Sequence, residues 1–202
     1  MSREIIAILR GVTPDEVLEI GETLVDAGID RIEVPLNSPE PFKSIGILAE
    51  GLKGRATIGA GTVLTPEQVD ELKSVGGTLV VSPDCNPAVI GRSKELGMLS
   101  FPGVTSPTEC FTALRHGADG LKFFPGFLVG AKGLAAISAV LPKGTKTYAV
   151  GGAGPENFGE WFDAGVTGFG IGSALYKPGM TADEVGEKAR AIVAAYDAGQ
   201  PA

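Results

Sequence analysis

The chain has 202 residues, enough for one large domain, and its formal net charge of −7 provides no basic stripe for nucleic acid. Aromatic residues make up only 6% of the chain, which also argues against a nucleic-acid-binding surface. No stretch is apolar and long enough to span a bilayer. The first apolar run begins almost at Met1 without an export-signal pattern, so we expect a cytoplasmic protein.

Apolar runs alternate with helical patterns along the chain, and the helices open with recurring signals. Thr13-Pro14-Asp15-Glu16 opens the first helix, Thr65-Pro66-Glu67 the third and Ser106-Pro107-Thr108-Glu109 the fifth. The runs expected to be strands cover residues 5–9, 32–36, 56–63, 78–83, 98–102, 120–125, 147–151 and 168–172. The helices expected after them run from 13 to 28, from about 39 to 52, from 65 onward, from about 87 to 96, and over 106–117, 131–141, 155–164 and 181–196.

Eight strand-and-helix units with a period of about 25 residues predict an α/β fold, the (β/α)8 TIM barrel. Such barrels typically have ~250 residues, so the connections here must be short. We therefore expect a single barrel domain over residues 1–202, with no room for a second one.

The cysteines and the histidine contribute little to the predicted chemistry. Cys85 and Cys110 are the only cysteines and stand in no CxxC or Cys/His cluster, so buried structural thiols are expected. His116, the only histidine, precedes Gly117 where a helix should end, so it is interpreted as a helix C-terminal residue. The sequence predicts neither a metal site nor a bound cofactor.

Lys122 stands alone as a charge in an apolar run bounded by Gly120 and Pro125, a pattern typical of a buried parallel strand. Burial lowers the pKa of an ammonium group, and the neutral amine is the form that condenses with a ketone to give an imine. Taken alone, a lysine that reaches solvent from a strand end is the simpler interpretation. The other polar residues that a barrel would bring to the same end favour a nucleophilic role for Lys122.

In such barrels the working face is the ring of loops after the carboxyl ends of the strands. Glu33 lies between apolar neighbours in the second run and is our candidate general acid/base; a structural ion pair with Arg10 or Lys122 is the alternative. Arg10 ends the first run, where its guanidinium group could bind a carboxylate with two hydrogen bonds or form a salt bridge at the rim of the barrel. The small residues at 59–62 leave room for a planar carboxylate, or they merely fit the barrel's taper.

Glycine pairs follow the last two strands of the predicted barrel. Gly151 and Gly152 come after the seventh run, and Gly172 with Ser173 after the eighth, where barrels often bind phosphate through backbone N–H groups. Each pair alone could be an ordinary turn, but the two together favour a phosphate site. A Rossmann site is excluded because the glycines lack an early βαβ context.

Five motifs, in order over nearly the whole chain, resemble the class I aldolases of 2-keto-3-deoxy-6-phosphosugar acids. They are IAILRG at 6–11, IEVPLNS at 32–38, IGAGTV at 58–63, LKFFP at 121–125 and AVGG at 149–152. The resemblance implies that Lys122 forms a Schiff base and Glu33 moves protons. It also implies that Thr62 and Arg10 hold the pyruvate carboxylate or neighbouring hydroxyls, with Pro83 lining the pyruvate pocket. The remaining roles it implies are phosphate binding by Gly151, Gly152, Gly172 and Ser173, no metal, and a homotrimer.

Two departures favour the family branch that acts on the galactonate epimer. The gluconate enzymes carry an arginine four residues after the catalytic glutamate, where this chain has Asn37, and Arg10 supplies the charge instead. They also carry a threonine where this chain has Val150, and losing a hydroxyl near the sugar's C4 should change which epimer is preferred. The implied reaction is cleavage of 2-dehydro-3-deoxy-6-phospho-D-galactonate to pyruvate and D-glyceraldehyde 3-phosphate.

Other functions remain open at this point. Within the family, the gluconate epimer or 4-hydroxy-2-oxoglutarate could be the substrate. Outside it, a phosphosugar isomerase would use Glu33 as base and Lys122 only as a charge, and a noncatalytic phosphate-ligand binding protein would hold the two as a buried ion pair.

Overall fold

The structure is a computed structural model that describes residues 3–200, so the expected domain limits at 1 and 202 lie outside the described residues. Nine parallel strands form one sheet in the order β5-β4-β3-β2-β1-β9-β8-β7-β6. The strands are β1 (Ile5–Ile8), β2 (Arg31–Pro35), β3 (Thr57–Gly61), β4 (Leu79–Val81), β5 (Leu99–Phe101), β6 (Gly103–Val104), β7 (Leu121–Phe123), β8 (Thr147–Val150) and β9 (Gly168–Ile171). The helices are α1 (Val17–Asp26), α2 (Pro41–Gly51), α3 (Pro66–Ser74), α4 (Pro87–Glu95), α5 (Pro107–Arg115), α6 (Gly126–Ser138), α7 (Phe158–Asp163) and α8 (Ala182–Gly199).

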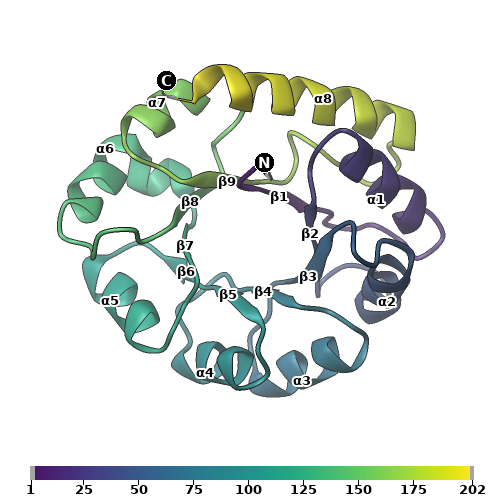
Figure 1. Cartoon of the computed structure of the whole chain (residues 1–202), viewed down its shortest axis with the longest axis horizontal. Helices are drawn as coiled ribbons and strands as arrows, with labels where there is room; N and C mark the ends of the chain where they lie inside the picture. Colours follow the sequence, from purple (N-terminus) through teal and green to yellow (C-terminus); the bar gives the residue numbers. More distant parts are fainter. Residues whose placement is uncertain (1–2, 201–202) are drawn as a thin grey trace.

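The sheet closes into a ring with the helices outside it (Figure 1), which confirms the predicted (β/α)8 barrel. The two ends of the sheet, β5 and β6, are consecutive in the chain and are separated only by Pro102. Proline has no N–H to donate to a ladder, whereas its carbonyl accepts a 2.9 Å hydrogen bond from the Lys122 backbone. The single strand expected over 98–102 is therefore two short strands that together fill one barrel position.

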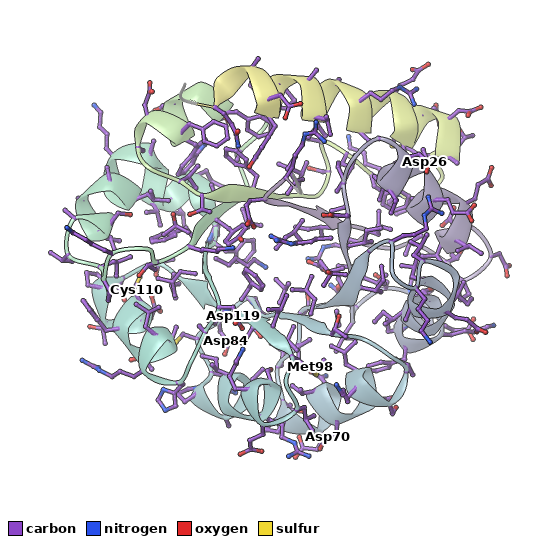
Figure 2. The ribbon with its side chains drawn as sticks, in the orientation of Figure 1. Asp26, Asp70, Asp84, Met98, Cys110 and Asp119 are labelled. Carbon is purple, nitrogen blue, oxygen red and sulfur yellow. The ribbon has the colours of Figure 1, made fainter. Side chains whose placement is uncertain are left out.

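Side chains alternate along each strand between the two faces of the ring. In β1, Ile5 and Ala7 pack in the outer cluster between sheet and helices, while Ile6 and Ile8 belong to the cluster inside the ring. Figure 2 shows side chains filling the space that the strands enclose. The barrel interior is therefore a packed core, open to ligands only where its ends leave room.

Several helices begin where the sequence placed their caps. Thr65, Ser106 and Thr181 each close a capping box with the side chain three residues later. The first helix differs, because the Glu16 carboxylate accepts the Thr13 backbone N–H at 2.9 Å and regular helix begins only at Val17.

Two later helices also differ from expectation. The helix expected from 131 begins at Gly126 and bends at Gly130, whose φ of 66° is outside the helical region. The helix expected from 155 begins at Phe158, because the side chain of Asn157 instead bonds the backbone of the preceding turn. Both changes lie next to the glycine loop after β8.

A hydrogen-bonded polar cluster lies at the amino end of the barrel. The Glu4 carboxylate accepts hydrogen bonds from Arg31, from the Tyr148 hydroxyl at 2.6 Å and from Lys146 Nζ at 2.9 Å. Burial alone would raise the pKa of Glu4, but the hydrogen bonds from Arg31, Tyr148 and Lys146 outweigh it and lower that pKa to about 2. We call Glu4, Arg31, Lys146 and Tyr148 the floor cluster.

The remaining sequence expectations concern thiols, the histidine and membrane spans. Cys110 is a buried free thiol on α5 as expected, whereas the free thiol of Cys85 is only half-buried. His116 is the exposed C-terminal cap of α5, as predicted. In the described part of the chain no helix combines the length and apolar character that crossing a membrane requires.

Candidate active site

Glu33 and Lys122 meet inside the carboxyl half of the barrel. Glu33 is the middle residue of β2 and Lys122 the middle residue of β7, and both side chains line one small inner cavity. Its volume of about 10 Å³ is room for roughly one water molecule. The rest of its wall is apolar or glycine: Ile6, Ile8, Val81, Phe101, Tyr148, Val150 and Gly170.

Lys122 is held in a mostly apolar setting, with only 6% of the residue exposed. Its Nζ lies 4.7 Å from the centre of the Phe124 ring, the next residue on the same side of the strand. Burial lowers the pKa of Lys122; the charge of Glu33 opposes this effect and that of Arg10 adds to it. The site therefore raises the share of neutral amine, the nucleophilic form.

Glu33 is even more enclosed, with 1% of the residue exposed. Burial raises the pKa of Glu33 to about 7, against the opposing effects of Lys122, Arg10 and the Gly61 backbone N–H. Its Oε2 atom is buried and has no hydrogen-bond partner within residues 3–200. A carboxyl group that titrates near neutrality and has an unused acceptor is suited to take and return a proton.

The small residues of β3 make room for Glu33 itself. A Cβ atom on Gly61 would lie 2.0 Å from Glu33 Oε2, and one on Gly59 would lie 1.8 Å from the Leu79 carbonyl oxygen. Gly61 thus admits the carboxylate of Glu33, and Gly59 fits the close packing of β3 on β4. The sequence predicted that a carboxylate could approach here, and the group that does so belongs to the protein.

A larger outer cavity of about 330 Å³ opens in front of the inner one. The two cavities share Ile8, Val150 and Gly170 in their walls, so they lie next to each other. The outer cavity brings together most of the predicted site residues, namely Arg10, Val150, Gly151, Gly152, Gly172 and Ser173.

Arg10 and the glycine loop after β8 are both held in place by hydrogen bonds. The Arg10 guanidinium donates to Asn37 Oδ1, which directs it from β1 toward β2. Gly151 and Gly152 have φ values of 86° and 82°, which favour glycine. Asn157 Nδ2 donates to the Gly152 carbonyl at 2.8 Å, and the Phe127 backbone donates to Gly151 at 3.0 Å.

Thr62 and Pro83 lie at the carboxyl ends of β3 and β4, but neither lines the two cavities described here. Both are half-buried. Thr62 has a φ of 58°, an uncommon value for a β-branched residue and one that often marks a functional turn. The roles expected for these two residues remain predictions.

Sequence reasoning missed several wall residues. Phe124 follows Lys122 by two positions, so strand alternation would have placed it on the same face. Lys177 lines the outer cavity from the loop after β9 and belongs to no recognisable motif. Its only sequence signal is its position four residues after Ser173.

The geometry supports imine chemistry coupled to proton transfer. A buried amine with a lowered pKa and a carboxyl group with a raised pKa share an apolar cavity, and a wider cavity with glycine-rich loops lies next to it. Among residues 3–200, no group of three or more His, Cys, Asp or Glu side chains could hold a metal ion.

Comparison with known proteins gives a consistent result. Residues 1–190 match the aldolase family model described as KDPG and KHG aldolase. A Rhizobium meliloti (strain 1021) protein named "Probable 2-dehydro-3-deoxy-6-phosphogalactonate aldolase" is 48% identical over 98% of this chain and 93% of its own length. The 2-dehydro-3-deoxy-6-phosphogalactonate aldolase of Escherichia coli K12 is 46% identical over 95% of this chain and 94% of its own. A solved structure described as native KDPGal superposes with a TM-score of 0.97 at 45% identity, covering 98% of this chain and 97% of that one.

Proposed function

The chain belongs to the KDPG and KHG aldolase family, and from this premise we propose that it cleaves 2-dehydro-3-deoxy-6-phospho-D-galactonate to pyruvate and D-glyceraldehyde 3-phosphate. The observation that carries the proposal is the pairing of Lys122 and Glu33 in one apolar cavity, each with its pKa moved toward neutrality. The phosphogluconate epimer and 4-hydroxy-2-oxoglutarate are the alternative substrates.

The proposed reaction needs only these two side chains for covalent and proton chemistry. The neutral Lys122 amine adds to the keto carbon, and loss of water gives a protonated imine. The C3–C4 bond then breaks, its electrons move into the imine to give an enamine, and the C4 hydroxyl proton passes to Glu33 as the aldehyde leaves. Glu33 returns a proton to C3, and water releases pyruvate and the Lys122 amine.

The outer cavity is the proposed location of the sugar chain and the phosphate. Arg10 and Thr62 hold the carboxylate or the neighbouring hydroxyls, and Pro83 borders the pyruvate moiety. The loops that carry Gly151, Gly152, Gly172 and Ser173 hold the phosphate, and the positive φ of the first two supports close approach of their backbone.

The galactonate epimer is favoured by Val150 and by the contact between Arg10 and Asn37. Val150 lines both cavities, so it lies where the sugar chain passes from the imine to the phosphate. It offers a methyl surface and no hydroxyl, so it cannot pair with a sugar hydroxyl that points toward it. The two curated relatives described above also carry the phosphogalactonate name.

Borohydride reduction in the presence of pyruvate tests the imine directly. We expect one reduced pyruvate adduct on the peptide that contains Lys122, detected by mass spectrometry, and none in Lys122→Met. No adduct on folded wild-type protein would remove the imine role and favour the isomerase or the binding protein. Cleavage rates on both phosphorylated epimers then decide the substrate.

The homotrimer and the cytoplasmic location are also part of this proposal. The exposed apolar residues Phe127 and Leu128 at the start of α6 offer a surface that assembly could cover. Light scattering coupled to gel filtration tests the trimer, and cell fractionation tests the location.

A further inference from the structure

Lys177 lies on the loop between β9 and α8, and its side chain lines the outer cavity together with Ser173 and the glycine loop after β8. We propose that Lys177 binds the substrate's phosphate and is the residue that selects phosphorylated over unphosphorylated sugar acids. This inference rests on the function proposed above and adds a residue that the sequence motifs did not contain.

The residues on either side of Lys177 fix its main chain. Tyr176 is buried, and its hydroxyl donates to Glu16 Oε1 at 3.1 Å. The Pro178 ring packs on Gly11 so closely that a Cβ atom there would lie 2.7 Å from Pro178 Cγ. Both contacts join the loop to the segment after β1, so Lys177 is held beside Arg10 before any ligand binds. Substrate then has to order only one side chain, which lowers the entropic cost of binding.

The charges in the outer cavity suit a phosphate dianion. Among residues 3–200, its wall contains two cationic side chains, Arg10 and Lys177, and no carboxylate, although the chain as a whole has a net charge of −7. A local positive field of this kind attracts an anionic ligand and raises its local concentration.

The two cations belong to different parts of the cavity. Arg10 contacts Asn37 and acts on the charges of Glu33 and Lys122, which places it toward the inner cavity. Lys177 is exposed, and in the described part of the chain its ammonium group forms no ion pair or side-chain hydrogen bond. It is therefore available to the other end of the substrate.

The remaining donors around the predicted phosphate position are neutral. Backbone N–H groups of the glycine loops and the Ser173 hydroxyl bind hydroxyl and carbonyl oxygens as well as phosphate. A charge-assisted hydrogen bond from an ammonium group is about twice as strong as a neutral one. Lys177 thus supplies the charged interaction that favours a phosphate dianion over an uncharged terminal hydroxyl.

The test compares Lys177→Ala and Lys177→Arg with wild type and with Lys143→Ala, an exposed lysine in the loop before β8, at the opposite end of the barrel. Steady-state cleavage of the phosphorylated acid and its unphosphorylated analogue gives the ratio of their kcat/KM values. We expect Lys177→Ala to lower this ratio about tenfold, mainly through a higher KM, and Lys177→Arg to restore most of it. Lys143→Ala should match wild type.

A second readout does not depend on turnover. Thermal-shift titration with inorganic phosphate gives a Kd, which should rise about tenfold in Lys177→Ala and not in Lys143→Ala. An unchanged kcat/KM ratio together with an unchanged phosphate Kd would overturn the role of Lys177. Failure of wild type to cleave either epimer would instead overturn the proposed function, and the phosphate Kd would still decide whether Lys177 binds phosphate.

Discussion

Gly61→Ala places a methyl group where the Glu33 carboxylate now lies. The added Cβ would be 2.0 Å from Oε2 and 2.4 Å from Cδ, whereas real Cβ contacts stay beyond 3.0 Å, so the carboxylate must retreat by about 1 Å. Gly61 is a strand residue without a positive φ, so alanine is allowed there as a backbone conformation. The substitution therefore acts through Glu33 and not through backbone strain at position 61.

The size of the effect follows from the overlap. Overpacking of a filled core costs about 1–3 kcal/mol. Alanine restricts the unfolded chain more than glycine does, which offsets this cost by roughly 0.4–1 kcal/mol. We expect a net loss of about 1–2 kcal/mol in the free energy of unfolding. A catalytic group displaced by about 1 Å can lose roughly 100-fold in rate, so kcat should fall by about two orders of magnitude in a protein that still folds.

A double-mutant cycle isolates the contact. In a Glu33→Ala background the new methyl enters vacated space, so Gly61→Ala should cost nothing or stabilise slightly. In a Glu33→Gln background the volume remains and only the charge is gone, so the loss of stability should persist. Urea unfolding followed through Trp161, the single and nearly buried tryptophan, gives the free energies, and pyruvate release gives kcat. Wild-type stability and turnover in Gly61→Ala would show that Gly61 does not shape the position of Glu33.

Three further predictions concern Glu33 and Val150. Glu33→Gln should still give a borohydride-trapped adduct but lower kcat by about 10²–10⁴, since it cannot exchange protons; full turnover would remove Glu33 from the mechanism. The raised pKa of Glu33, about 7 against 4.5, means that its contribution to stability is complete below about pH 4.5 and is lost as pH rises through 7. That shift corresponds to about 3 kcal/mol, so urea curves at pH 5 and pH 8 should differ more for wild type than for Glu33→Gln, and equal differences would contradict the assignment. Val150→Thr should raise kcat/KM on the gluconate epimer relative to the galactonate one, and an unchanged ratio would count against Val150 as the selecting residue.

The sequence was sufficient for the barrel and for the pairing of Glu33 with Lys122. Both depend on patterns with a fixed physical meaning, since apolar runs alternate with capped helices and the last polar residues of parallel strands must share one mouth. Local patterns also placed the helix starts at Thr65, Ser106 and Thr181, where the structure has capping boxes.

What the sequence could not supply depends on contacts between distant segments. Pro102 divides a strand because it has no N–H for the ladder, while its carbonyl accepts a hydrogen bond from the backbone of Lys122 in a neighbouring segment. Gly61 is small because of Glu33, which lies 28 positions earlier in the chain. Lys177 reaches the outer cavity because Tyr176 and Pro178 pack on the loop after β1. No local sequence pattern indicates any of these contacts.

The floor cluster has a kinetic consequence. Glu4, Arg31, Lys146 and Tyr148 are joined by hydrogen bonds at the amino end of the barrel, so we propose that substrate reaches Lys122 from the outer cavity. In the reaction proposed above, the part of the substrate that occupies the outer cavity would then stand between Lys122 and bulk water. The proposed reaction therefore releases the phosphorylated aldehyde first, and pyruvate, bound to Lys122 as the imine, follows it. In the synthetic direction pyruvate must add before the aldehyde, so product-inhibition patterns should be those of an ordered sequence and not a random one.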